Sequence, residues 1–260
     1  MSASLLSEMS SLIYQLDALG VALPEGIAEK IFAYLALLQK WNRTYNLTAI
    51  RDPEQMLTHH ALDALAIVPA LDRVLGEILA EDAAANPRPP EAGTPFEKGA
   101  LGAASIGSAR TESSPRLLDV GSGGGVPGLM LALARPAWQV TMVDAVQKKM
   151  AFVTQAITEL RLSNAQTLTA RVESLRAEAL VPPMRYDLAV SRAFSDLTTF
   201  VACSRHLLTP RGVWAAMKGA VPDAEIAALP ADIVVRAVEE LTVPGLDARR
   251  HLILLEQAHA

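Results

Sequence analysis

Hydrophobic and polar positions follow a helical period over the first part of the chain. Apolar side chains recur every three or four residues in three segments, 4–20, 24–41 and 53–79. Pro24 and Pro53 stand near the starts of the second and third segments, where proline is favoured because the first helical turn leaves its N–H groups unbonded. The pattern therefore predicts a helical N-terminal part over residues 1–80.

A different pattern begins at Arg116, where short apolar runs alternate with amphipathic segments. Strands are predicted at 116–120, 139–144, 164–171, 186–191, 212–217, 233–243 and 249–257. Helices are predicted at 126–134, 146–160, 173–180, 195–208 and 222–229. This alternation is typical of a mainly parallel, doubly wound α/β sheet over residues 116–260. Only a short Pro-Gly-Leu-Asp segment separates the last two strands, so they are expected to close the sheet as a β-hairpin.

Residues 81–115 separate the two parts and are rich in alanine, proline and glycine. Large aliphatic side chains are almost absent there, so the segment cannot bury a core of its own. We expect a flexible insert, with an ordered extra element as the alternative.

Composition narrows the class of protein. The 260 residues, 51% hydrophobic and 20% charged, suffice for one α/β core with a smaller appendage. The single cysteine, Cys203, excludes an internal disulfide and favours a reducing compartment. No apolar run reaches the roughly 18 residues that span a bilayer, and the N-terminus lacks the basic start of a signal peptide. A cytoplasmic monomer without a membrane partner is expected. The net charge of −5 argues mildly against a general nucleic-acid binder but leaves RNA binding open.

The most informative segment is LLDVGSGGGVPG, at 117–128. An apolar run, a glycine cluster and a helix start follow one another, as where a nucleotide cofactor meets the main chain and the N–H groups of a helix. Read from Gly121, the loop has the spacing typical of S-adenosylmethionine-dependent methyltransferases. Read from Gly123, it also satisfies the dinucleotide pattern G-x-G-x-x-G, and a glycine turn that binds nothing is a third interpretation.

Two acidic residues bear on this choice. Asp119 would repel a pyrophosphate at the loop, but it would attract the ammonium and sulfonium groups of S-adenosylmethionine. Asp144 ends the second predicted strand, where a carboxylate accepts hydrogen bonds from the ribose hydroxyls of either cofactor or caps the next helix. Dehydrogenase sheets normally lack a closing hairpin. Asp119 and the hairpin therefore favour S-adenosylmethionine.

With these features the chain resembles the RsmG (GidB) family. The matching segments run in order from near residue 30 to the end: KWNRTYNLTAIRDPEQML (40–57), HHALDALAI (59–67), LLDVGSGGGVPGL (117–129), ARVESL (170–175), SRAF (191–194), MKG (217–219) and LDARRHLILLE (246–256). The proline-rich insert is the chief departure. The resemblance implies a Rossmann-type class I methyltransferase sheet and S-adenosylmethionine as cofactor. It also implies methyl transfer to N7 of guanine 527 in 16S ribosomal RNA, either naked or in a small-subunit particle.

Methylation at N7 of guanine is consistent with the residues that the sequence contains. The lone pair of N7 is free and N7 loses no proton on attack, so alignment and electrostatics can provide the catalysis without a general base. Methyltransferases of exocyclic amines commonly carry an Asn/Asp-Pro-Pro-aromatic segment after the fourth strand, and this chain has Ser191-Arg192-Ala193-Phe194 there. An amine acceptor is therefore disfavoured.

The family's site residues carry over to matching positions. The expected cofactor-binding residues are Asp119, Gly121, Gly123, Gly125, Val126, Asp144, Val172, Glu173 and Arg192. Val172 and Glu173 match the pair beside the adenine, while Gly123 and Gly125 shape the turn. Arg192 matches the active-site arginine and is the expected catalytic residue. Three roles stay open for it: orienting the guanine, binding RNA phosphate or holding the cofactor carboxylate.

Candidate RNA contacts are Arg43, Lys148 and Lys218, which are expected at element ends or in a segment that mixes aromatic and donor side chains. A solvated surface charge is the alternative for each of them. Trp41 and Tyr45, beside Arg43, are better explained by packing of the helical part on the sheet.

No metal is expected. His59, His60 and Asp63 are of metal-ligand types, but two adjacent histidines diverge on a helix and the resembled family uses no metal.

Two other classes remain open. A small-molecule methyltransferase would use residues 1–80 as a lid and would act on small acceptors but not on ribosomal RNA. A nicotinamide-dependent oxidoreductase would use the register from Gly123, tolerate Asp119, and bind NAD tightly without binding S-adenosylmethionine.

Overall fold

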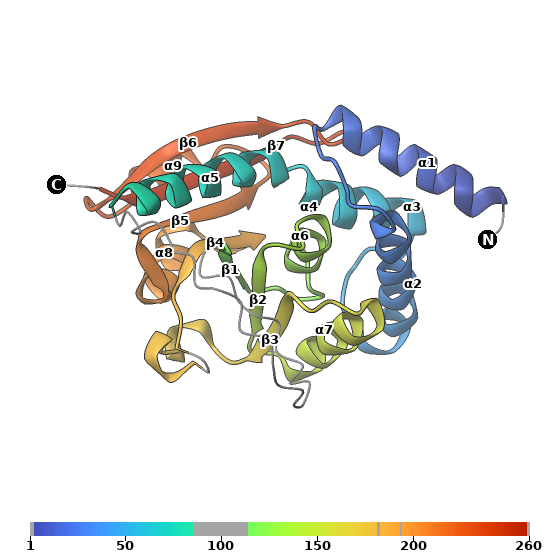
Figure 1. The fold of residues 1–260 in the computed structure, drawn as a ribbon, viewed down its shortest axis with the longest axis horizontal. Coiled ribbons are helices and arrows are strands. Elements are labelled where there is room, and N and C mark those ends of the chain that lie inside the picture. The colour runs from blue at the N-terminus through green and yellow to red at the C-terminus, as the bar shows by residue number, and fades with distance from the viewer. Residues whose placement is uncertain (1–2, 86–113, 181–182, 193, 259–260) are drawn as a thin grey trace, which may run out of the picture.

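A seven-stranded sheet forms the centre of the computed structural model, which describes residues 3–85, 114–180, 183–192 and 194–258. The strands are β1 (Arg116–Val120), β2 (Gln139–Asp144), β3 (Ala165–Thr169), β4 (Tyr186–Arg192), β5 (Leu208–Lys218), β6 (Ile233–Leu241) and β7 (Arg250–Gln257). Their order is β3-β2-β1-β4-β5-β7-β6, with β1 to β5 parallel and β7 antiparallel to both neighbours. This arrangement, drawn in Figure 1, confirms the predicted α/β sheet with a closing hairpin.

Helices connect the parallel strands as predicted, with one exception. The connecting helices are α6 (Gly128–Ala134), α7 (Gln147–Leu160), α8 (Leu197–Ser204), which the 3-10 turn η4 (Arg205–Leu207) continues, and α9 (Asp223–Ala227). The helix predicted at 173–180 is wrong, because the chain forms two 3-10 turns, η2 (Val172–Ser174) and η3 (Ala177–Ala179). Val172 and Ala177 are buried in the same core. Five residues apart, they would point about 140° away from each other on an α-helix, so the broken conformation buries both.

The N-terminal part is helical, as predicted. It contains α1 (Ala3–Ala18), α2 (Ile27–Tyr45), α3 (Pro53–Met56), the π-helical segment η1 (Leu57–Leu62), α4 (Asp63–Leu65) and α5 (Val68–Ala85). Pro53 opens α3, and the Asp52 carboxylate caps it by accepting from the Gln55 N–H at 2.9 Å. The helical spacing predicted over 53–79 corresponds to four successive helical elements, α3, η1, α4 and α5, with a short turn before α5. Helix α5 ends at Ala85, so the first residues of the expected insert are helical, and 86–113 lie outside the described residues.

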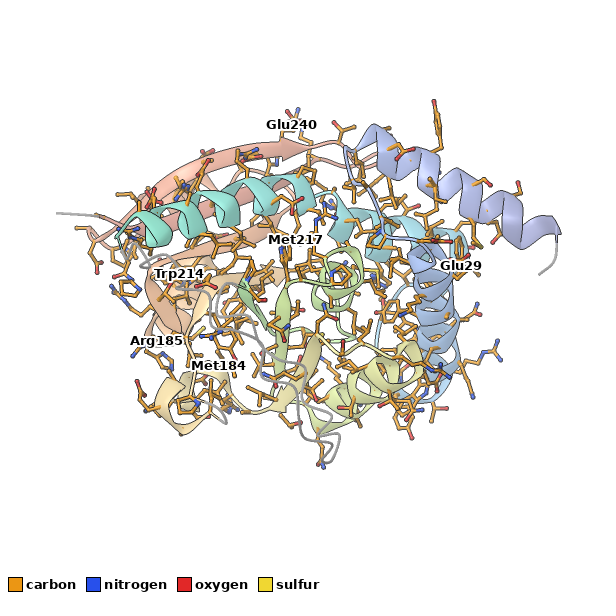
Figure 2. All side chains as sticks on the ribbon, in the orientation of Figure 1. Glu29, Met184, Arg185, Trp214, Met217 and Glu240 are labelled. Atoms are coloured by element: carbon orange, nitrogen blue, oxygen red, sulfur yellow. The ribbon has the colours of Figure 1, made fainter. Side chains whose placement is uncertain are left out.

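Two hydrophobic cores cover the two faces of the sheet. Alternate strand residues point to opposite faces, so Leu117 of β1 belongs to one core and Leu118 to the other. The same holds for Trp214 and Met217 of β5, which are labelled in Figure 2. Helices α1, α2, α5, α6 and α7 share the Leu117 core, and α8 packs in the Leu118 core. The N-terminal helices therefore complete the core of the sheet.

Two contacts show how the N-terminal helices attach. Trp41 of α2 packs on Phe152 of α7 with ring centroids 5.6 Å apart, which confirms the packing role predicted for Trp41. Helix α5 lies along the β6–β7 hairpin (Figure 1), where Arg73 pairs with Glu239 and Glu77 pairs with Arg236. Within the described ranges, no helix has the length and apolar content that a bilayer crossing requires.

Candidate functional site

The glycine loop between β1 and α6 is folded tightly onto β2. Gly121, Gly123 and Gly125 have φ values of +71°, +57° and +87°, in the left-handed region that favours glycine. The N–H groups of Gly121 and Ser122 donate to the carbonyl oxygen of Val143, at 2.8 and 3.1 Å. Gly123 and Gly125 thus shape the turn of the loop, as expected from the sequence.

Asp119 lies buried beneath this loop. Its Oδ2 accepts a hydrogen bond of 2.8 Å from the N–H of Gly128, the first residue of α6. A Cβ at Gly128 would stand 2.7 Å from that oxygen and 2.5 Å from Cγ of Met142, so only glycine fits this close contact of helix and strand.

The second oxygen of the Asp119 carboxylate, Oδ1, is suited to a cationic ligand. Burial raises the pKa of Asp119 to about 7, against the lowering effects of the Gly128 N–H and of Arg192. Its Oδ1, like Oγ of Ser122, is buried without a hydrogen-bond partner among the described residues. A ligand that brings an ammonium group would satisfy such an oxygen. This geometry fits the predicted role of Asp119 with S-adenosylmethionine.

Asp144, at the end of β2, accepts two backbone hydrogen bonds. Its Oδ1 accepts from the N–H of Val146 at 2.8 Å, at the entry to α7, and its Oδ2 accepts from the N–H of Gly123 at 3.1 Å. The ammonium of Lys149 lies 3.6 Å from Oδ2. A carboxylate has about four acceptor positions, so capacity for ribose hydroxyls remains, and that role stays a prediction.

Val172 and Glu173 follow β3 at the same edge of the sheet. Thr169 at the end of β3 pairs with Asp144 at the end of β2, which places η2 at the carboxyl ends of the strands. Val172 is buried, whereas the Glu173 carboxylate is more than half exposed and lies 3.8 Å from Arg171. Their predicted place beside the adenine stays a prediction.

The N-terminal helices contribute side chains to the cofactor side of the site. The hydroxyl of Tyr34, in α2, donates a hydrogen bond of 2.8 Å to the carbonyl oxygen of Gly124. A hollow of about 190 Å³, here called the donor hollow, lies above the loop. It is lined by Tyr34, Leu38, Leu47, Thr48, His60, Gly121, Ser122, Gly123, Gly124, Val126 and Arg192. Tyr34 was not among the predicted site residues, because in the sequence its ring only continues the apolar pattern of a helix.

Arg192, at the end of β4, reaches the π-helical segment. Its Nη1 donates to the carbonyl oxygen of His59 at 2.7 Å and lies 3.5 Å from Oδ2 of Asp63. That carbonyl is available because the N–H of Asp63 bonds to the carbonyl of Thr58, five residues back, in place of His59. The π-helical turn thereby provides an acceptor for the predicted catalytic arginine.

His60 orients the same guanidinium. Nη2 of Arg192 lies 3.3 Å from Nδ1 of His60, and Nε2 of His60 lies 3.0 Å from Oγ1 of Thr48. Burial, and next the charge of Arg192, lower the pKa of His60 to about 4, so the ring is neutral at pH 7. With Nε2 protonated, the ring accepts from Arg192 and donates to Thr48.

His60 and Asp63 thus position an arginine. The described residues contain no group of three or more His, Cys, Asp or Glu side chains arranged to hold a metal. The sequence showed these two side chains as polar residues in an apolar segment but did not show what they contact.

A second hollow, of about 410 Å³, is also lined by Arg192 and is here called the acceptor hollow. It is lined by Ile50, His59, His60, Asp63, Arg192, Met217, Lys218, Gly219 and Arg250. The ammonium of Lys218 lies 2.8 and 3.1 Å from the carboxylate oxygens of Glu225, so its charge is already paired. His60 and Arg192 line both hollows.

The other two candidate RNA contacts lie outside both hollows. Arg43 is exposed on α2, beside Arg51 at the edge of a separate surface hollow. Lys148 is exposed in the first turn of α7. Neither makes an ion pair within the part of the chain that the structure describes.

Comparison with known proteins identifies the family. The GidB family model, described as rRNA small subunit methyltransferase G, matches residues 27–78 and 96–253. Ribosomal RNA small subunit methyltransferase G of Burkholderia thailandensis is 48% identical over 240 residues, which cover 92% of this chain and 87% of that protein. The protein of the same name from Burkholderia multivorans is 47% identical over 236 residues, covering 91% and 86%.

Two solved structures resemble about half of the chain. TrmN from Thermus thermophilus is 21% identical with a TM-score of 0.43, covering 56% of this chain and 44% of its own. The O-methyltransferase NcsB1 from neocarzinostatin biosynthesis is 17% identical with a TM-score of 0.45, covering 56% and 49%. Because these likenesses are weak, the fold assignment rests on the strand order.

The family comparisons confirm the resemblance found in the sequence. One family model spans most of the chain, and the curated relatives match it nearly from end to end. The chain belongs to the GidB family, rRNA small subunit methyltransferase G.

Proposed function

We propose that the protein transfers a methyl group from S-adenosylmethionine to N7 of guanine 527 in 16S ribosomal RNA by direct in-line displacement. The position of Arg192 carries this proposal, because this residue lines both the donor hollow and the acceptor hollow. In an open α/β sheet, ligands bind at the carboxyl ends of the strands where the strand order reverses. Arg192 ends β4, which pairs with β1 at that reversal.

The methyl donor is S-adenosylmethionine, as in the methyltransferase family to which the chain belongs. It supplies a methyl group on a positively charged sulfur. On the protein side, Asp119 would hold the ammonium group and Asp144 the ribose hydroxyls, with Val172 and Glu173 beside the adenine. The glycine loop lets the main chain approach the ligand closely. Family membership leaves the nicotinamide-dependent oxidoreductase without support.

Three titratable groups near the acceptor hollow are engaged by neighbouring side chains. His60 is neutral with both ring nitrogens engaged, Asp63 contacts two arginines, and Glu225 pairs with Lys218. His59 also lines this hollow, and its Nδ1 lies 3.1 Å from the carbonyl oxygen of Gln55. His60, Asp63 and Glu225 are therefore not placed to remove a proton from an acceptor. Guanine N7 attacks through a free lone pair, so its orientation by Arg192 would provide the main contribution.

The RNA would approach from the acceptor side. Arg43 and Lys148 are exposed cations and serve as phosphate contacts in this proposal, whereas Lys218 mainly holds Glu225. The substrate is 16S ribosomal RNA or a small-subunit particle, and we expect the protein to act as a monomer in the cytoplasm, without a metal.

RNA synthesised with 7-deazaguanine at the target position tests the proposal, because a carbon replaces N7 there. Purified protein with labelled S-adenosylmethionine should methylate the unmodified RNA and leave the 7-deaza RNA unlabelled. Equal labelling of both RNAs would contradict N7 as the acceptor. Activity on small acceptors with none on ribosomal RNA would identify the small-molecule alternative.

A further inference from the structure

We infer that Arg250 forms a phosphate-binding contact in the acceptor hollow, and that Asp63 is the positioning residue that holds Arg250 beside Arg192. The inference rests on the proposed function, since the phosphate belongs to the RNA strand that carries the target guanine. It assigns roles to two residues that had none among the predicted site residues.

The closing hairpin places Arg250 at the site. Strand β7 runs antiparallel to β5, so the first residues of β7 lie next to the last residues of β5. His251 pairs with Lys218, and Arg250 begins β7 one residue earlier. The arginine therefore reaches the edge where the parallel strands end, although it starts a strand.

Asp63 joins the two arginines. Its Oδ1 accepts from Nε of Arg250 at 2.9 Å, while its Oδ2 lies 3.5 Å from Nη1 of Arg192. The Asp63 side chain is only 4% exposed, whereas those of Arg192 and Arg250 are 25% and 24% exposed. A buried carboxylate contacts both guanidinium groups, and each group remains accessible at the hollow.

Arg250 keeps donors for a ligand. Its Nε bonds to Asp63 and its Nη1 donates to the carbonyl oxygen of Arg249 at 3.0 Å. Its Nη2 has no hydrogen-bond partner among the residues that the structure describes. Guanidinium N–H groups match the spacing of phosphate oxygens, so this end of the side chain is suited to a phosphate.

The charges around the hollow also suit one anion. Two guanidinium groups face one carboxylate, which leaves one net positive charge at Asp63. Lys218 and Glu225 neutralise each other, and His60 is neutral at pH 7. An RNA phosphate carries one negative charge. The hollow therefore has the charge expected for a single phosphate contact.

Salt dependence separates this role from a purely structural ion pair. Each neutralised phosphate adds about 0.7 to 0.9 to the slope of log affinity against log salt concentration. The measurement uses the full chain and unmodified small-subunit ribosomal RNA over roughly 50 to 200 mM salt. The variants are Arg250→Ala, Arg250→Lys, and Arg205→Ala as the matched control. Arg205 also pairs with one aspartate, Asp232, but it precedes β5 at the opposite edge of the sheet.

Arg250→Ala should weaken RNA binding roughly 10-fold to 100-fold, the range of a charged hydrogen bond. It should also flatten the salt slope by about one contact. Arg250→Lys, which keeps the charge beside Asp63, should retain the slope, as should Arg205→Ala. The affinity for S-adenosylmethionine should stay at the wild-type value in all three.

An unchanged salt slope in Arg250→Ala overturns the inference, whatever happens to the affinity. An unchanged slope with weaker binding of S-adenosylmethionine would assign Arg250 to the cofactor carboxylate instead. Methylation by the wild-type protein in the same assay tests the proposed function separately. A wild-type protein that binds this RNA without methylating it would contradict the proposed function and not the phosphate contact.

Discussion

Nη2 of Arg192 lies 3.3 Å from Nδ1 of His60, a contact between the end of β4 and the π-helical segment 132 residues earlier in the chain. A protonated imidazole could not accept from a guanidinium, so the contact requires a neutral ring. His60 therefore couples the position of the predicted catalytic arginine to its own protonation.

This coupling predicts that the stability of the protein depends on pH. The native His60 ring titrates at about 4, whereas in the unfolded chain it titrates near 6.5. Between these values the unfolded state binds more protons, so the contribution of His60 is present at pH 7 and is lost as the pH falls. Urea denaturation should show that, between pH 7 and pH 5, wild type loses about 2 kcal/mol more free energy of unfolding than His60→Gln.

The His60→Gln variant provides the control for that measurement, because it lacks the titrating ring. If wild type and His60→Gln lose the same stability between pH 7 and pH 5, the neutral His60 ring is not the source.

A second prediction concerns a proton on Asp119. Burial raises the pKa of Asp119 to about 7, so a fraction of the molecules carries this proton at pH 7. An ammonium group bound nearby would lower the pKa, so binding of S-adenosylmethionine should release protons from that fraction. Calorimetric titrations at pH 7 in buffers of different ionisation enthalpy measure the release. Asp119→Asn keeps an acceptor for Gly128 and should abolish it. Equal release by wild type and variant would place the ammonium group elsewhere.

Two glycine substitutions test the close contact of α6 with the sheet. A methyl group at Gly128 would meet Met142 and Asp119 at 2.5 and 2.7 Å, so Gly128→Ala should lower the free energy of unfolding by about 1–3 kcal/mol. Gly76, exposed in α5, has nothing within 4 Å of its Cβ position. Gly76→Ala should therefore be neutral or stabilising by up to about 1 kcal/mol. Urea denaturation compares the two, and a Gly128→Ala variant as stable as wild type would show that the helix can shift at no cost.

Arg192 is expected to affect methyl transfer more than folding. Arg192→Ala removes a hydrogen-bond donor that lines both hollows, and misplacement of the methyl acceptor lowers the rate roughly 100-fold. Arg192→Lys keeps the positive charge, but a lysine cannot hydrogen-bond to His59 and His60 at the same time. This variant should therefore transfer the methyl group nearly as slowly as Arg192→Ala. Single-turnover methyl transfer measures the rate, and circular dichroism checks the fold. Wild-type transfer by Arg192→Ala would remove this residue from the site.

Local patterns in the sequence were sufficient for most elements of the fold. Strands β1 and β2 were predicted at their observed bounds, because a buried parallel strand is a short apolar run. The closing hairpin was also predicted, from the short turn between two strand patterns. The turns at Val172 and Ala177 were not, because their conformation is determined by packing against a core that other segments build.

The candidate site was predictable only in part. The glycine loop is a continuous segment with a fixed spacing, so its residues could be named from the sequence. The contact of Tyr34 with Gly124 spans 90 residues, and that of Arg250 with Asp63 spans 187. No local pattern encodes such pairs. One signal for Arg250 was available, since the second strand of a closing hairpin must begin where β5 ends.

Mapping 7-methylguanine across 16S ribosomal RNA tests the central claim most directly. The RNA is taken from the source organism and from a strain that lacks the gene for this protein, and borohydride reduction with aniline cleavage cuts it at 7-methylguanine. We expect cleavage at guanine 527 in the parent strain, none at that position without the gene, and its return when wild-type protein is supplied but not Arg192→Ala. An identical cleavage pattern in both strains would contradict the account.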